Sequence, residues 1–447
     1  MKEKLSGKER LFIGSLIFGL FFGAGNLIFP IQIGQEAGSN VFQANLGFLV
    51  TGIGLPFLGL ISFGLSRSSD LYSLASKVGK KYGLWFTTIL YLIIGPMFAM
   101  PRLASTSFEI GLSPFIKNEY QNLFLLLFSI IFFLCVWYFS RKPSRILDYI
   151  GKFLTPLFLI LLFFILLLSF LNPLGDLTGS LPQDSYVQGA FFKGFQDGYN
   201  TLDALAALAF GMLIIENIQN FEIKESKLIA KETMKSGFVG IVLMGIIYTL
   251  LAFLGAMSLG TFSLNKNGGI TLAQVADYYL GPIGSVILAV IVIVACLKTA
   301  IGLATAFGRT FSELYPNISY QVFTIGCISL AGVIANVGLN QIIALSIPIL
   351  MFIYPLAMTL IILGVLDPII KDKPEVYCFT TYFTIIVSIF DGLNSLPSNI
   401  KATSLIKVLL NFATDYLPLF NIGMSWIIFA VVGFTFGWLL NKKREHA

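Results

Sequence analysis

Apolar runs of helical length occupy most of this chain, and this pattern leaves few folds open to it. A helix needs about 20 residues to cross a bilayer core that is about 30 Å thick. Charged residues make up 12% of the sequence, against about 25% in an average soluble domain. So few charges cannot cover a water-facing surface. The sequence therefore predicts an all-α integral membrane protein that lies in the lipid bilayer.

The apolar runs predict about twelve transmembrane helices in one membrane domain that extends over residues 1–447. Each run is too long and too uniformly apolar for the alternating strands of a membrane barrel. We expect the helices at 11–31, 41–65, 84–108, 122–139, 150–171, 187–215, 236–259, 282–307, 320–337, 342–366, 376–391 and 419–440.

Lysines and arginines gather in every second loop, beginning with Lys2, Lys4, Lys8 and Arg10 before the first run. The positive-inside rule then places both termini in the cytoplasm. The net charge of +6 is spread over these short loops, so it does not indicate a partner nucleic acid. The single histidine, His446, is next to last, and the four cysteines lack metal-ligand spacing. These features argue against an enzyme, a cofactor or a metal centre.

Two loops have a pattern of their own. Residues 217–235 alternate Glu and Lys, which predicts a solvated cytoplasmic helix. Residues 398–413 place leucines and isoleucines on one face and lysines on another, which predicts a helix that lies at the outer membrane interface.

The first apolar run contains GLFFGAGNLIFP, with Gly23, Gly25 and Asn26 past the middle of the span. A glycine costs about 1 kcal/mol in a helix interior relative to alanine. Close helix packing through Gly19 and Gly23 is the simpler explanation, but it leaves Asn26 and the following proline unexplained. We therefore expect a helix that stops and restarts inside the membrane.

A second interruption occurs in the sixth run, where Gly198, Asn200, Thr201 and Asp203 lie near the middle of the membrane. Two broken helices that are five helices apart are typical of inverted repeats. The N–H groups of a restarting half-helix can receive a carboxylate, and freed carbonyls can receive an ammonium group or a cation.

Five segments, read in order, resemble the bacterial branched-chain amino acid:cation symporter family over nearly the whole chain. They are FFGAGNLIFP, GPMFAMPRLASTSFEIG, NTLDALAALAFG, CLKTAIGL and SIPILMFIYPLA. The resemblance implies a LeuT-type fold of the amino acid/polyamine/organocation superfamily, with discontinuous helices 1 and 6. Its two five-helix repeats would span 11–171 and 187–366, and two extra helices would span 376–440. It also implies uptake of leucine, isoleucine and valine with Na⁺ (Li⁺ or H⁺ in some members) across the bacterial cytoplasmic membrane.

Carried to this chain, the resemblance implies a substrate site at the two breaks. The backbone of Gly23, Ala24, Gly25 and Asn26 would receive the carboxylate, with Asn26 helping to hold the break or an ion. Oxygens from the second break would receive the ammonium group; its residues are Tyr199, Asn200, Thr201, Leu202 and Asp203. The plainer alternatives are a packing kink at the first break and, for Asp203, a structural bond to a neighbouring helix.

Arg102 and Glu109 are seven residues apart near the outer end of the third run, so they share a helix face. One interpretation is a gate or a group that attracts substrate. The other is an arginine that extends to the membrane interface.

In LeuT-type transporters an ion site joins helix 1 to hydroxyl residues of helix 8. In this chain that site would use Gly19, Phe22, Ala295, Lys298 and Thr299, and Lys298 stands where the family pattern has a hydroxyl residue. Two hypotheses stay open. The ammonium of Lys298 replaces the cation, or it points away toward an acidic residue or the cytoplasmic edge. Coupling to Na⁺, to H⁺ or to no ion is therefore open.

Three other functions compete with this one: an ion channel, a membrane enzyme and a transporter of another small neutral amino acid. A channel needs a filter, and an enzyme needs converging catalytic groups; neither pattern is present in the sequence. The sequence does not rank leucine, isoleucine and valine, and it does not set the oligomeric state.

Overall fold

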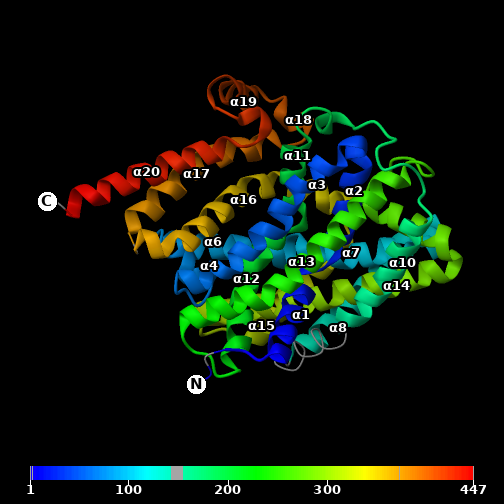
Figure 1. Ribbon diagram of the computed structural model, residues 1–447, viewed down its shortest axis with the longest axis horizontal. Coiled ribbons are helices and arrows are strands. Elements are labelled where there is room, and N and C mark those ends of the chain that lie inside the picture. Colours follow the sequence, from blue (N-terminus) through cyan, green and yellow to red (C-terminus); the bar gives the residue numbers. More distant parts are fainter. Residues whose placement is uncertain (1, 3, 142–154, 372, 446–447) are drawn as a thin grey trace.

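The structure is a computed structural model that describes residues 2, 4–141, 155–371 and 373–445. Every regular element in these ranges is helical, and Figure 1 shows a bundle of long helices. The prediction of an all-α fold is confirmed. Residues 142–154, which include the start of the predicted run 150–171, lie outside the described residues, as does His446.

Within the described residues, each predicted run overlaps one helix or a pair of helices. The α-helices are α1 (Gly7–Phe21), α2 (Ala24–Ala37), α3 (Val41–Leu49), α4 (Leu55–Leu65), α5 (Leu71–Ala75), α6 (Lys80–Leu92), α7 (Ala99–Gly111), α8 (Gln121–Ser140), α10 (Thr155–Leu171), α11 (Ala190–Asp197), α12 (Asp203–Gln219), α13 (Ser226–Ser258), α14 (Gly268–Leu314), α15 (Tyr320–Ala335), α16 (Leu339–Ile370), α17 (Pro374–Asn394), α18 (Ser398–Lys401), α19 (Ser404–Tyr416) and α20 (Ser425–Glu445).

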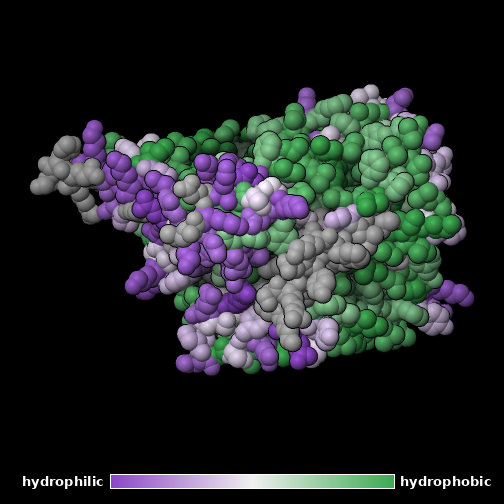
Figure 2. Space-filling model, turned by 60° about the horizontal axis from the view of Figure 1, so that its bottom comes forward, coloured by the Kyte–Doolittle hydropathy of each residue, from purple (hydrophilic) through white to green (hydrophobic). Residues whose placement is uncertain are grey.

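Within the described ranges, eight helical segments are long and apolar enough to cross a membrane, and the bent pair α11 and α12 makes a ninth. Two shorter apolar helices, Leu162–Leu171 and Tyr320–Ala335, match two further predicted runs. Figure 2 shows a broad hydrophobic surface beside a hydrophilic region. Exposed leucines and isoleucines of α8, such as Ile131 and Leu134, suit contact with lipid tails. The chain is a multi-pass membrane protein.

Both predicted helix breaks are present. Between α1 and α2, Phe22 and Gly23 take extended conformations, with ψ of 96° and −157°. Between α11 and α12, a 3₁₀ turn over Gly198–Thr201 is followed by Leu202 at φ 65°, and the two helices bend by 43°. A further break within α14 occurs at Gly281, whose φ of 58° favours glycine. It falls where the predicted run 282–307 begins.

Broken helices need close neighbours, because each interrupted turn leaves backbone groups that water cannot reach. The second half of the first span, α2, packs directly on α13. A Cβ atom at Gly34 would overlap the carbonyl oxygen of Ala252, and one at Gly255 would overlap that of Ile31. Glycines at these two positions therefore let the backbones of α2 and α13 touch, which places α13 beside the first break.

Two loop predictions need correction. Residues 226–235 begin α13, so no separate solvated helix covers 217–235. Glu232 in this stretch is 1% exposed and accepts two bonds from Arg10, at 2.8 and 3.1 Å. The alternating charges indicated solvent, but one of them is instead buried in an ion pair. The predicted interfacial helix 398–413 is two helices, α18 and α19, separated at Ala402 and Thr403.

Candidate functional site

One asparagine links the two helix breaks. The Asn26 side-chain oxygen accepts the N–H of Gly23 at 2.8 Å, which satisfies a backbone donor that the break had freed. Its Nδ2 donates to Asp203 Oδ2 at 2.6 Å and also to the hydroxyl of Tyr248 on α13. The Tyr248 hydroxyl donates to the same Asp203 oxygen at 2.8 Å. The exposed fractions of Asn26, Asp203 and Tyr248 are 1%, 2% and 0%, so this polar network is buried and fully enclosed by protein.

A cavity of about 30 Å³ lies between the breaks, where α7 and α14 also approach them. Its volume is enough for one or two water molecules. An amino acid can enter only if the surrounding helices move apart. Its lining residues are Leu20, Phe21, Gly23, Gly25, Asn26, Ile94, Ala99, Arg102, Leu103, Thr201, Leu202, Asp203, Ala206, Thr299 and Leu303.

The structure brings most of the predicted substrate residues to this cavity. From the first break these are Gly23, Gly25 and Asn26, and from the second they are Thr201, Leu202 and Asp203. Tyr199 and Asn200 are buried outside it, and the Tyr199 ring stacks on Tyr354 with centroids 4.4 Å apart. Ala24 contributes its backbone to the first turn of α2. Because Asn26 already occupies the Gly23 N–H, that group is not free for a carboxylate.

The residues of the predicted ion site meet where α1 ends. The Thr299 hydroxyl lies 3.2 Å from the carbonyl oxygen of Ala295 and 3.5 Å from that of Phe22. Lys298 is completely buried, and its Nζ lies 5.5 Å from the ring centroid of Phe18, one turn before the break. Gly19 is buried in the same turn of α1. Lys298 therefore faces α1 rather than the cytoplasmic edge.

Arg102 lies deeper than an interfacial arginine. Its side chain is 3% exposed, lines the cavity and lies over the ring of Phe29 at 5.1 Å. An arginine that extends to the membrane interface keeps its charge in water, so that interpretation is wrong for Arg102.

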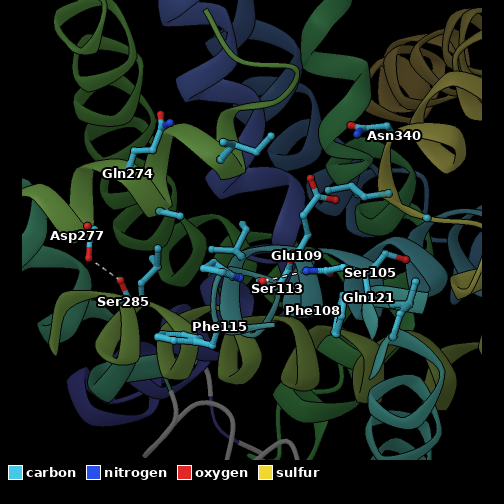
Figure 3. A pocket seen from close by; sticks show the side chains of 18 of the residues that line it. Ser105, Phe108, Glu109, Ser113, Phe115, Gln121, Gln274, Asp277, Ser285 and Asn340 are labelled. Carbon is cyan, nitrogen blue, oxygen red and sulfur yellow. Dashed lines mark hydrogen bonds between the residues drawn. The ribbon is translucent and has the colours of Figure 1, made fainter. Parts of the chain in front are cut away.

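Glu109 lies on the same helix, two turns further along, and contacts a different region. Its Oε1 accepts a bond of 2.8 Å from Asn267, the residue that caps the start of α14. It lines a separate, larger cavity of about 840 Å³ together with Ser105, Gln274 and Asn340 (Figure 3). Asn267 also bonds Asn340 at 3.0 Å. Glu109 thus helps to hold the short helical segment before Gly281 against α7.

One residue of this site, Tyr248, was not predicted from the sequence, and neither was the depth of another, Arg102. Tyr248 is one of several aromatic residues in an apolar run, and no local pattern distinguishes it. The sequence does contain a signal for the depth of Arg102, because a charged residue within an apolar run is costly unless it faces the protein interior.

This arrangement defines a class of protein: a membrane transporter whose two discontinuous helices meet at a buried polar site. Solved structures support the fold. The chain aligns with a nucleobase-cation-symport-1 family transporter, MHP1, at a TM-score of 0.60 and 13% identity, covering 96% of this chain and 91% of that one. It aligns with a manganese transporter of Eremococcus coleocola at a TM-score of 0.58 and 14% identity, covering 96% and 95%.

Comparison with known sequences identifies the family within this class of transporters. Residues 6–444 match the family described as branched-chain amino acid transport protein, and the chain belongs to this family. It is 42% identical to the branched-chain amino acid permease BrnQ of Bacillus subtilis over 99% of both chains. It is also 42% identical to BrnQ of Lactobacillus delbrueckii subsp. lactis, over 99% of this chain and 100% of that one. The family and these relatives are transport proteins, and the chain is not an enzyme.

Proposed function

We propose that this chain takes up leucine, isoleucine and valine by secondary active transport, with the substrate bound between the two helix breaks. The observation that carries the proposal is the cavity where both breaks meet, whose walls combine the carboxylate of Asp203 with Leu103, Leu202 and Leu303. The polar part suits an amino acid's charged groups, and the leucines suit an aliphatic side chain. One methylene changes binding by only about 1–3 kcal/mol, so all three substrates fit one site.

In this proposal the protein lies in the cytoplasmic membrane of a bacterium with both termini inside. The lysines and arginines of alternate loops support this orientation, and the relatives named as permeases are bacterial. The repeats 11–171 and 187–366 would move relative to one another around the site, with 376–440 as an addition outside them.

Purified protein in liposomes is expected to concentrate radiolabelled leucine above its outside level under an inward ion gradient. Unlabelled isoleucine and valine should compete, whereas lysine and glutamate should not, because Leu103, Leu202 and Leu303 offer no partner to a charged side chain. A channel would equilibrate its substrate without concentrating it. If alanine or another neutral amino acid competes and the branched-chain amino acids do not, the proposed substrate is wrong.

We further propose that the ammonium group of Lys298 supplies the positive charge that a coupling Na⁺ supplies in related transporters. The carbonyl end of a helix carries a partial negative charge that favours a cation. Lys298 lies beside this end of α1, and its neighbour Thr299 reaches the Phe22 carbonyl at 3.5 Å. An ammonium can change its charge only by losing a proton, so the coupled ion would be H⁺.

Wild-type protein is then expected to accumulate leucine under a proton gradient when choline replaces Na⁺, at a rate that varies with pH. Lys298→Thr restores a hydroxyl residue and should make uptake depend on Na⁺, with a stimulation of at least about tenfold, or about 1.4 kcal/mol. The measurement is the initial rate of leucine uptake in choline and in Na⁺. Lys407→Thr, at an exposed lysine of α19, is the matched control. A wild type that strictly requires Na⁺ contradicts this coupling.

A further inference from the structure

Arg102 lines the cavity between the helix breaks with part of its hydrogen-bonding capacity unused. Its side chain is only 3% exposed, and its Nη1 has no hydrogen-bond partner in the described part of the chain. A guanidinium group carries five N–H donors and stays charged. A buried donor that lacks an acceptor loses the hydrogen bonds that it makes to water, and the loss is larger when the donor is charged. An acceptor on a bound ligand would remove this cost.

The position of the guanidinium group shows which charge that ligand carries. Its Nη2 lies 3.2 Å from the place where a Cβ atom of Gly25 would be, so it lies at the first turn of α2. The first turn of a helix presents unpaired N–H groups and a partial positive charge. The charge of the guanidinium group and the partial positive charge of the helix end therefore meet at one cavity, an arrangement that favours an anion. The missing side chain at Gly25 leaves room for an anion to reach both.

A second charged group lines the same cavity. Asp203 has one oxygen, Oδ2, that accepts bonds from Asn26 and Tyr248. The cavity thus holds one cationic and one anionic side chain. An α-amino acid carries a carboxylate and an ammonium group on one carbon, so its charges match this pair without adding net charge to the buried site. Arginine also matches a carboxylate with two parallel hydrogen bonds.

We propose that Arg102 binds the carboxylate of the substrate, while Asp203 receives the ammonium group. The proposal rests on the function proposed above, and it names the group that makes the site specific for amino acids. In this role Arg102 takes the place of the Gly23 N–H, which already donates to Asn26. The consequence is that a compound with the leucine side chain and ammonium group, but without the carboxylate, is rejected.

The test compares leucine with leucinol, in which CH₂OH replaces the carboxylate. Each compound is measured for its ability to displace radiolabelled leucine from the purified, full-length protein. Wild type is expected to bind leucine at least roughly 100-fold more tightly than leucinol, since loss of one partner leaves the other charge buried and unpaired. Arg102→Met should bring leucine down to the affinity of leucinol, measured by direct binding of each compound. The leucinol affinity itself should change less than about fivefold.

Two variants control for damage to the fold. Arg102→Lys keeps the charge but loses the paired geometry, so it is expected to keep an intermediate preference for leucine. Arg67→Met removes an exposed arginine from a loop and is expected to keep the wild-type preference. Thermal unfolding in detergent reports whether each variant is folded. If Arg102→Met does not fold, the wild-type ratio and Arg102→Lys decide the question.

A wild type that binds leucine and leucinol equally overturns the role of Arg102 and leaves the proposed function standing. A folded Arg102→Met that keeps the wild-type ratio does the same. If wild type binds no branched-chain amino acid, the proposed function fails, and the amino acid that does bind, compared with its own alcohol, decides the role of Arg102. A wild type that binds none of the twenty amino acids overturns both.

Discussion

Asp203→Ala is expected to reduce leucine uptake by at least about 100-fold, or about 2.7 kcal/mol. The substitution removes the anionic group of the cavity. It also leaves the Tyr248 hydroxyl without its acceptor and leaves Asn26 Nδ2 with that hydroxyl as its remaining acceptor. Each unsatisfied buried donor costs about 1–3 kcal/mol. The measurement is the initial rate of radiolabelled leucine uptake by reconstituted protein, together with its melting temperature.

Three further variants separate charge from structure. Asp203→Asn keeps the size of the side chain and an acceptor oxygen, so it should fold better than Asp203→Ala but still fail to transport. Tyr248→Phe removes one donor and should lower uptake less than either. Asp415→Ala removes an exposed carboxylate of α19 and should leave uptake unchanged. An Asp203→Asn protein that transports at the wild-type rate would restrict Asp203 to a structural role.

Gly25→Leu is expected to abolish leucine binding, with a loss of at least about 100-fold. A Cβ atom at this position would lie 3.2 Å from Arg102 Nη2 and 3.4 Å from two ring carbons of Phe29. The other leucine carbons would have to enter a cavity of about 30 Å³. The obstruction is local, so the protein should still insert and fold. Equilibrium binding of radiolabelled leucine to purified protein measures the effect.

Comparing a small with a large side chain at position 25 tests whether steric obstruction causes the loss of binding. Gly25→Ala adds one carbon at a contact that is tight but can relax, so its loss of affinity should be much smaller than that of Gly25→Leu. Gly326→Leu makes the same change on α15, where a Cβ atom meets nothing within 4 Å. This control should bind leucine as wild type does. Unchanged affinity in Gly25→Leu would move the substrate away from the first break.

The helix breaks were predictable because their causes are local. Glycine, asparagine and proline within an apolar run weaken helix geometry wherever that run is placed, and the cost of unpaired backbone in lipid makes such residues informative. The structure confirms both interruptions, at Gly23 and at Gly198–Thr201. The residues with which each break makes contact do not follow from the same reasoning.

The partners were decided by contacts between residues far apart in the chain. Asn26 and Asp203 are separated by 177 positions, and Asn26 and Tyr248 by 222. Helix periodicity shows which residues share a face, but not which helix that face meets. For the same reason the sequence did not separate Arg102 from Glu109. The two residues share a helix face but line different cavities. The same reason explains the burial of Glu232. The alternating charges around this residue predicted exposure to solvent, but in the fold α1 places Arg10 against it.

The sequence by itself determined the membrane class, the position of nearly every helix and the existence of two broken helices, because hydrophobic length and backbone propensity act on each segment alone. Only the tertiary structure decided that the breaks meet through Asn26, that Arg102 reaches the cavity between them and that Lys298 faces α1. These outcomes depend on the rotation and depth of one helix against another. They are set by close packing at positions such as Gly34 and Gly255, where the backbones touch.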